Sequence, residues 1–275
     1  MNVFEYAETI LLKGDLDNKL IDKEIIDWSV KSPRSPIVVD LPVRNDSIRI
    51  SSDQVKFPKK GALKDSYQRG KALHFFANHE LLAIEMMAYA IVMFPFEKES
   101  VYKSLVETIS EEQKHLKLYI KRMNEFGVEF GDFPLNQYFW SFMEKMENIE
   151  MFFSVIALTF EQANLDFALY YKNLFKDLGD SKTAAVMEVI YQDEIKHVAR
   201  GRSHLSKVVS KSEEYISFWD YFLSLLPAPL TADRAKGMIF DEKGRQKAGL
   251  DQAFIQNLKD YKGDFKITQR KEWKS

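Results

Sequence analysis

Apolar residues recur every three or four positions from about residue 63 to residue 209, in long stretches with almost no glycine or proline. This period is that of helices that bury one face. The stretches are interrupted at Pro95, at Gly127 with the turn-forming residues that follow it, and at the sequence GDS, residues 179–181. The pattern therefore predicts long helices over residues 63–93, 97–126, 148–178 and 181–209, with a short helix near 136–146.

The flanking segments have a different pattern. Residues 3–12 predict a short amphipathic helix, whereas residues 15–62 contain four prolines and only a weak alternation, so we expect them to wrap the long helices. After residue 210 the pattern predicts helices near 212–226 and 250–261. The expected organisation is an N-terminal helix and wrapping extension (1–62), a helical bundle (63–210) and a C-terminal helical extension (211–275).

The connection between the second and third long helices is the longest of the bundle. Short connections join helices that lie antiparallel, whereas a long one crosses the bundle. The sequence therefore predicts an all-α fold of the ferritin-like kind, a four-helix bundle with one long crossover.

One motif occurs in two of these helices. Residues 111–115 read EEQKH and residues 193–197 read DEIKH. Glu112 and His115 are three residues apart, so they project from the same face of a helix, as do Glu194 and His197. A carboxylate and an imidazole on one face suit divalent iron or manganese.

The other two long helices offer matching carboxylates. Glu112 follows Glu80 by 32 residues, and Glu194 follows Glu161 by 33. One Glu from each of two helices and a Glu-x-x-His pair from each of the others is the ligand set of di-metal carboxylate bundles. The predicted ligands are Glu80, Glu112, His115, Glu161, Glu194 and His197.

Alternatives exist for two of these ligands. Glu85 lies on the same predicted helix as Glu80 but about 140° round the axis, so both cannot face one metal, and the matching register favours Glu80. Whether Glu85 replaces Glu80 stays open at this point. Glu150 is the alternative to Glu161 on the third helix, and the same register favours Glu161.

The acids that precede the two pairs also have an expected role. A metal-bound imidazole usually donates its second N–H to a carboxylate, which fixes the tautomer. Asp193 is predicted to orient His115, and Glu111 to orient His197.

A competing interpretation treats both motifs as solvated, charged helix faces. The first motif does not fit it, because Glu112 and His115 lie beside the apolar stripe of Leu105, Ile109 and Leu116. The remaining histidines, His74, His79 and His204, have no matching set of carboxylates and are expected to be packing residues.

Composition narrows the chemistry further. The chain of 275 residues contains no cysteine, so any metal must be held by nitrogen and oxygen. Its formal net charge of −2 does not indicate a nucleic-acid partner. We find no secretory signal pattern and no uncharged apolar run long enough for a membrane span, so we expect a cytoplasmic protein.

The segments ANHELLAIE, EEQKHLKLY, GVEFGDFP, TFEQANLD and QDEIKHVARG resemble an uncharacterised bacterial branch of the ferritin-like di-iron carboxylate superfamily. The ligand pattern is similar to that of the tRNA-modifying and ubiquinone-pathway hydroxylases of that superfamily. The resemblance implies that the six residues named above hold two irons, or a mixed iron and manganese pair; two manganese ions are a further alternative. It implies no substrate, because one fold carries many activities.

The resulting hypothesis is a di-metal oxidoreductase that activates dioxygen and hydroxylates or desaturates a small organic substrate, with electrons from an external donor. We expect a monomer or homodimer. An alternative is a ferroxidase, iron-handling or peroxide-scavenging protein without an organic substrate. A third is a bundle in which the metal only supports the structure.

Overall fold

The computed structural model describes residues 1–30, 34–53, 56–210 and 217–263. These residues form helices and contain no β-strand, which confirms the predicted all-α class. They belong to two compact units, Met1–Glu144 and Lys145–Ser275, which are described separately. The ferritin-like arrangement of the four long helices, and the domain boundaries at residues 62 and 210, stay predictions.

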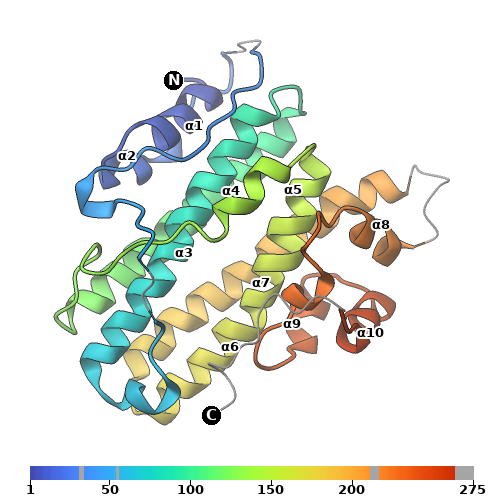
Figure 1. Ribbon diagram of the computed structural model, residues 1–275. Coiled ribbons are helices and arrows are strands. Elements are labelled where there is room, and N and C mark those ends of the chain that lie inside the picture. Colours follow the sequence, from blue (N-terminus) through green and yellow to red (C-terminus); the bar gives the residue numbers. More distant parts are fainter. Residues whose placement is uncertain (31–33, 54–55, 211–216, 264–275) are drawn as a thin grey trace. The chain divides into compact units, whose positions relative to one another are not determined.

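The centre of the first unit is a pair of long helices. Helices α3 (Ser66–Met93) and α4 (Glu99–Asn124) pack side by side (Figure 1). α3 is apolar on nearly every side and is mostly buried, as a core helix must be. α4 is amphipathic, and most of its charged residues are exposed, whereas Glu112 and Arg122 are buried. Both helices begin and end within three residues of the predicted positions.

α3 also meets the length and composition of a membrane-spanning helix. However, 78% of its most apolar window is buried inside the protein. A core helix has this property, so the described part of the chain gives no clear membrane span.

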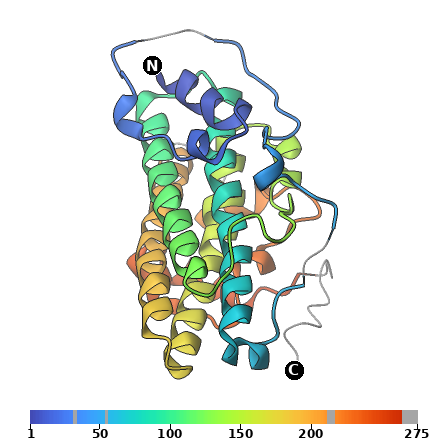
Figure 2. The same ribbon diagram turned by 90° about the vertical axis from the view of Figure 1, so that its left-hand side faces the viewer.

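The N-terminal segment packs on this helix pair. α1 (Val3–Leu12) lies against α3 (Figures 1 and 2) and begins with a capping box between Asn2 and Glu5. The rest of the segment is irregular and contains the short elements α2 (Leu16–Lys19), η1 (Lys23–Ile25), η2 (Asp46–Ile48) and η3 (Lys60–Lys64). Gln113 of α4 donates from Nε2 to the carbonyl oxygens of Lys19 and Ile21, both at 3.0 Å. The segment therefore lies along α3 and α4, and its irregular backbone is what its prolines predict.

A buried group of three charged side chains fastens this segment to α3. Lys19 Nζ lies 3.1 Å from Glu85 Oε1, and Arg44 contacts both oxygens of the same carboxylate at 2.6 and 3.1 Å. Burial lowers the pKa of Lys19, and the adjacent Glu85 carboxylate opposes this shift. Glu85 thus joins two distant parts of the N-terminal segment to the core helix.

The second unit is also built on two long antiparallel helices. The first is continuous through α5 (Ile149–Val155), η5 (Ile156–Glu161) and α6 (Gln162–Asp177), and the second is α7 (Ser181–Val209) (Figure 1). The turn between them contains Gly179 with φ 77°, and the Asp180 side chain caps α7 by accepting from the Thr183 N–H. The η4 helix (Trp140–Lys145), at the C-terminal end of the first unit, corresponds to the short helix predicted before this pair.

The segment η5 is a π-helix, a feature that the sequence did not predict. The Gln162 N–H donates to the Ala157 carbonyl, and Thr159 Oγ1 donates to the Ser154 carbonyl, each five residues back. α7 approaches this segment closely, because a Cβ atom on Gly201 would lie 2.4 Å from the Cβ atom of Ala157. A glycine is therefore required at that contact.

The C-terminal segment packs on α6 and α7 of the second unit. It contains α8 (Phe218–Ser224), η6 (Ala232–Ala235), α9 (Glu242–Lys247) and α10 (Gln252–Asp260). α8 and α10 agree with the predicted helices, although residues 212–216 of the former lie outside the described residues. η6 and α9 were not predicted.

A buried ion pair fastens this segment. Asp166 on α6 accepts from Arg245 on α9 at 2.6 and 2.9 Å, and neither side chain is exposed. Asp166 also accepts from the backbone N–H groups of Gly237 and Asp241. One carboxylate therefore organises the residues between η6 and α9.

We expect Asp166→Asn to lower the free energy of unfolding by about 3–5 kcal/mol, because it leaves the buried Arg245 guanidinium without a compensating charge. Urea unfolding followed by circular dichroism measures the loss. The control is Glu188→Gln, which removes the partly exposed Lys172–Glu188 pair and should change stability by less than about 1 kcal/mol. Equal losses in the two variants would contradict the assigned role of Asp166.

Candidate metal centre

The first unit brings three of the predicted ligands together. Glu80 lies on α3, and Glu112 and His115 lie on α4; all three are buried, and each offers an atom within 4.8 Å of the others. His115 Nδ1 is 3.0 Å from Glu112 Oε2 and 3.9 Å from Glu80 Oε2. We call these three residues the first half-site.

The second unit brings together the other three, which we call the second half-site. Glu161 is the last residue of η5, and Glu194 and His197 lie on α7. His197 Nδ1 is 3.8 Å from Glu161 Oε1 and 3.6 Å from Glu194 Oε2. Asn164 on α6 donates from Nδ2 to Glu194 Oε1 at 3.2 Å, so it holds the second oxygen of that carboxylate.

The two half-sites have the same construction. In each, the three-residue helical spacing puts a Glu and a His on one face, and the neighbouring helix supplies the second Glu. In each, the imidazole faces the carboxylates through Nδ1. The near-equal separations of 32 and 33 residues correspond to this shared geometry.

The π-helical segment next to the second half-site is the local feature that sequence reasoning missed. A π turn carries one residue more than an α turn, so it changes the direction of the side chains that follow it, and such segments are frequent at functional sites. Glu161 closes the segment, and Asn164 follows one turn later. The residues of η5 carry no pattern from which the extra residue could be inferred.

The electrostatics of the first half-site favour a bound cation. Burial raises the pKa of Glu80 well above its ordinary value, and the nearby Glu112 carboxylate raises it further, whereas His115 lowers it. Two buried carboxylates this close resist being charged together. A divalent cation would stabilise both as anions and would displace the proton.

The donor atoms fit such an ion. Three of the four carboxylate–imidazole distances are 3.6–3.9 Å, which is too long for a hydrogen bond. Small divalent ions bind oxygen and nitrogen at about 2.1 Å, so two ligands of one ion lie about 3 Å apart when at right angles. Small side-chain adjustments would bring each half-site to that spacing. The residues present therefore fit a divalent metal held by oxygen and nitrogen.

The alternative carboxylates are engaged elsewhere. Glu85 lies in the buried group with Lys19 and Arg44, so its carboxylate already has two cations. Glu150 lies 3.9 Å from His204 Nε2, on the side of the unit where Phe153 packs on His204. These placements favour Glu80 and Glu161 as the ligands.

Asp193 and Glu111, the acids predicted to orient the imidazoles, each belong to a different unit from the histidine that they would orient. Asp193 Oδ1 accepts from Lys196 Nζ at 2.7 Å, one turn along α7. The predicted bonds from His115 to Asp193 and from His197 to Glu111 join residues of different units, and they stay predictions.

The other histidines pack among aromatic rings. His74 Nε2 accepts from the Gly131 N–H at 3.0 Å, and its ring lies against Phe130 and Phe133. Burial lowers the pKa of His74 to about 4, so the ring is neutral at pH 7. His79 lies between Phe75 and Phe139. Among the described residues, clusters with metal-ligand spacing are drawn only from the six predicted ligands.

Comparison with known proteins identifies a family for this chain. The model of a family described as "Protein of unknown function (DUF455)" matches residues 6–256, which include both half-sites. No curated protein and no solved structure matches the chain.

The variants Glu80→Gln and Glu85→Gln should separate metal binding from structural support. Glu80→Gln is expected to lose bound metal while the metal-free protein keeps its stability, because a buried carboxylate without a cation is costly. Glu85→Gln is expected to keep the metal but to lower the free energy of unfolding by about 3–5 kcal/mol, because Lys19 and Arg44 lose their partner. Elemental analysis and urea unfolding measure both quantities, and the reverse pattern would identify Glu85 as the ligand.

The stability of the protein should depend on His74 below pH 6.5. The unfolded chain, with an ordinary histidine pKa of about 6.5, binds a proton there, whereas the folded protein, with a pKa of about 4, does not. Between pH 7 and pH 5 the wild type should therefore lose about 2 kcal/mol more than His74→Gln. Parallel stability profiles for the two proteins would show that His74 takes up a proton in the folded state.

Proposed function

We propose a function from the site itself, because the chain belongs to a family, DUF455, whose description states none: the protein is a di-metal oxidoreductase of the ferritin-like kind that uses dioxygen. The observation that carries the proposal is the presence of two buried half-sites of identical construction, each a Glu with a Glu-x-x-His pair. We propose that they are the two halves of one centre that holds two metal ions. A Glu from each of two helices and a Glu-x-x-His pair from each of the others is the ligand set known from such centres.

The donor set supports iron as the metal, with an iron and manganese pair or two manganese ions as alternatives. Four carboxylates and two imidazoles are ligands for borderline and hard divalent ions, and the chain has no thiolate for softer ones. Four carboxylates would carry four negative charges, which two divalent cations balance. A centre of this kind would be neutral in its reduced state and stable in a buried position.

When bound, such a metal pair supplies one-electron redox changes and open positions for dioxygen. The chain contributes the surroundings. The buried positions of Glu112, His115, Glu194 and His197 exclude water, and the Asn164 amide fixes one oxygen of Glu194. Burial and the neighbouring Glu112 carboxylate raise the pKa of Glu80, so a cation bound beside it would favour the ionised carboxylate.

The proposed reaction oxidises a small organic molecule by hydroxylation or desaturation. Each turnover with dioxygen requires electrons from outside, because the chain has no cysteine pair to supply them. We therefore propose an external electron donor. Ferroxidase or peroxide-scavenging activity uses the same ligands and is distinguished by the test below.

We expect the anaerobically iron-loaded protein to hold two metal ions per chain and to consume dioxygen when exposed to it. Glu112→Ala should lose the metal, whereas Glu107→Ala, which removes an exposed carboxylate from the same helix, should keep it. Elemental analysis and an oxygen electrode give both results. An unchanged melting temperature in Glu112→Ala would exclude a purely structural metal.

Three outcomes would contradict the proposal or redirect it. Fewer than two metals per chain would refute the six-ligand assignment. Two metals without oxygen consumption would refute the use of dioxygen. Oxygen consumption that continues with ferrous iron alone, and that yields ferric mineral, would favour the ferroxidase alternative.

A further inference from the structure

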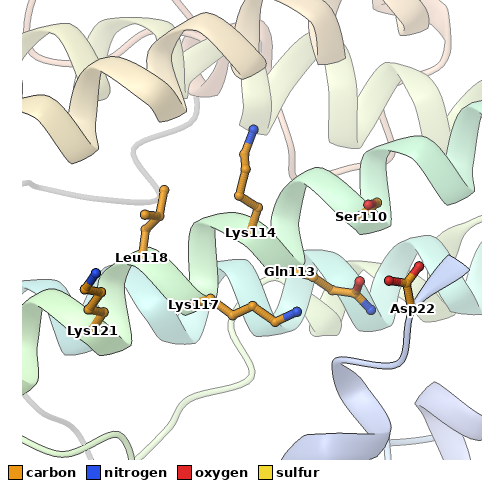
Figure 3. Close-up of a pocket in the computed structure, with 7 residues that line it drawn as sticks. All are labelled: Asp22, Ser110, Gln113, Lys114, Lys117, Leu118 and Lys121. Atoms are coloured by element: carbon orange, nitrogen blue, oxygen red, sulfur yellow. The ribbon is translucent and has the colours of Figure 1, made fainter.

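A pocket of about 390 Å³ lies on α4 of the first unit (Figure 3). Lys121 follows Glu112 by nine residues, which places it about 180° round the helix axis. The pocket is therefore on the opposite side of α4 from the first half-site. Its polar lining comes from α4, apart from one acid of the N-terminal segment: Ser110, Gln113, Lys114, Lys117, Lys121 and Asp22.

The charge of this lining is positive and only partly balanced. Lys114, Lys117 and Lys121 are exposed and share one face of α4. Lys117 and Lys121, four residues apart, make no hydrogen bond or ion pair with the described residues. Like charges at this spacing destabilise a helix, so an anion between them would be favoured.

The walls of the pocket are held in place by contacts that do not involve the side chains of the three lining lysines. Gln113 Nε2 donates to the carbonyls of Lys19 and Ile21, which holds the neighbouring Asp22 beside α4 (Figure 3). Asp22 itself accepts from the Glu24 N–H. A ligand would therefore enter a preformed site and order only the lysine side chains.

We propose that this pocket binds a small molecule that carries phosphate groups. Its volume is within the range of small-molecule sites, and all its lining residues except Leu118 are polar or charged, which suits an anionic group. Lysine ammonium groups bind phosphate as point charges, and the Ser110 hydroxyl adds a neutral donor. A doubly charged anion balances Lys117 and Lys121 better than a single carboxylate does.

The surroundings of the pocket favour a compact ligand over an extended nucleic acid. Glu107 of α4 and Glu125, the residue that caps the C-terminal end of α4, lie before and after the lysines; their side chains are 51% and 38% exposed and pair with Lys23 and Arg122. A phosphodiester backbone that follows the helix would meet these acids. A single phosphate or pyrophosphate group fits between them.

The test is calorimetric titration of the full-length protein with inorganic pyrophosphate at low ionic strength. We expect saturable binding with a one-to-one stoichiometry. The double variant Lys117→Gln/Lys121→Gln should weaken binding by about tenfold or more, because two charge contacts are lost. Asp22→Asn should strengthen binding several-fold, because it removes the acid in the lining.

Lys103→Gln is the matched control, since Lys103 is an exposed lysine of the same helix that pairs with Glu99 outside the pocket. It should bind pyrophosphate as the wild type does. The proposal is overturned if millimolar pyrophosphate gives no binding, or if the double variant and the control lose affinity equally. It is also overturned if a short single-stranded RNA binds more tightly than pyrophosphate at the same salt concentration.

Discussion

The cost of burying carboxylates is the constraint on which both units of this protein depend. An ionised carboxylate removed from water must be compensated by a cation, a proton or several hydrogen bonds. Glu85 and Asp166 are compensated by Lys and Arg side chains, and each fastens a terminal segment to a long helix. Glu80 and Glu112 are placed instead with each other and with His115, and burial together with Glu112 raises the pKa of Glu80. The first kind of buried acid supports the fold, and the second kind is the arrangement that a metal ion completes.

The buried acids that pair with Lys or Arg link the terminal segments to the helices that carry the proposed ligands, although these segments supply no ligand themselves. The N-terminal segment covers α3 and α4 and is held by Lys19 and Arg44, while the C-terminal segment covers α6 and α7 and is held by Arg245. The parts of both long helix pairs that these segments cover are thereby shielded from water. In the proposed function, this rigidity holds the carboxylates at the spacing that a metal requires.

Much of the fold and of the site could be predicted from the sequence because both depend on local spacing. The long helices follow from the apolar period, and the pairing of Glu112 with His115 follows from the helical repeat. The preference for Glu80 over Glu85 came from the matching separations between the helices. The structure supports this preference, because the Glu85 carboxylate is paired with Lys19 and Arg44. The contacts of Asp166 could not be predicted, because they join residues far apart in the chain. The π segment before Gln162 could not be predicted either, because its residues carry no pattern that indicates an extra residue in the turn. The short helix α9 was not predicted because it has no strong local pattern. Its Arg245 is held by an ion pair with the distant Asp166.

The central claim is that the two half-sites form one centre with two metals, and anomalous X-ray diffraction from crystals of the iron-loaded protein tests it most directly. The account predicts two anomalous peaks per chain, bonded to His115 and His197 respectively and sharing carboxylates between them. A single peak, or peaks whose ligands all come from one half-site, would contradict it.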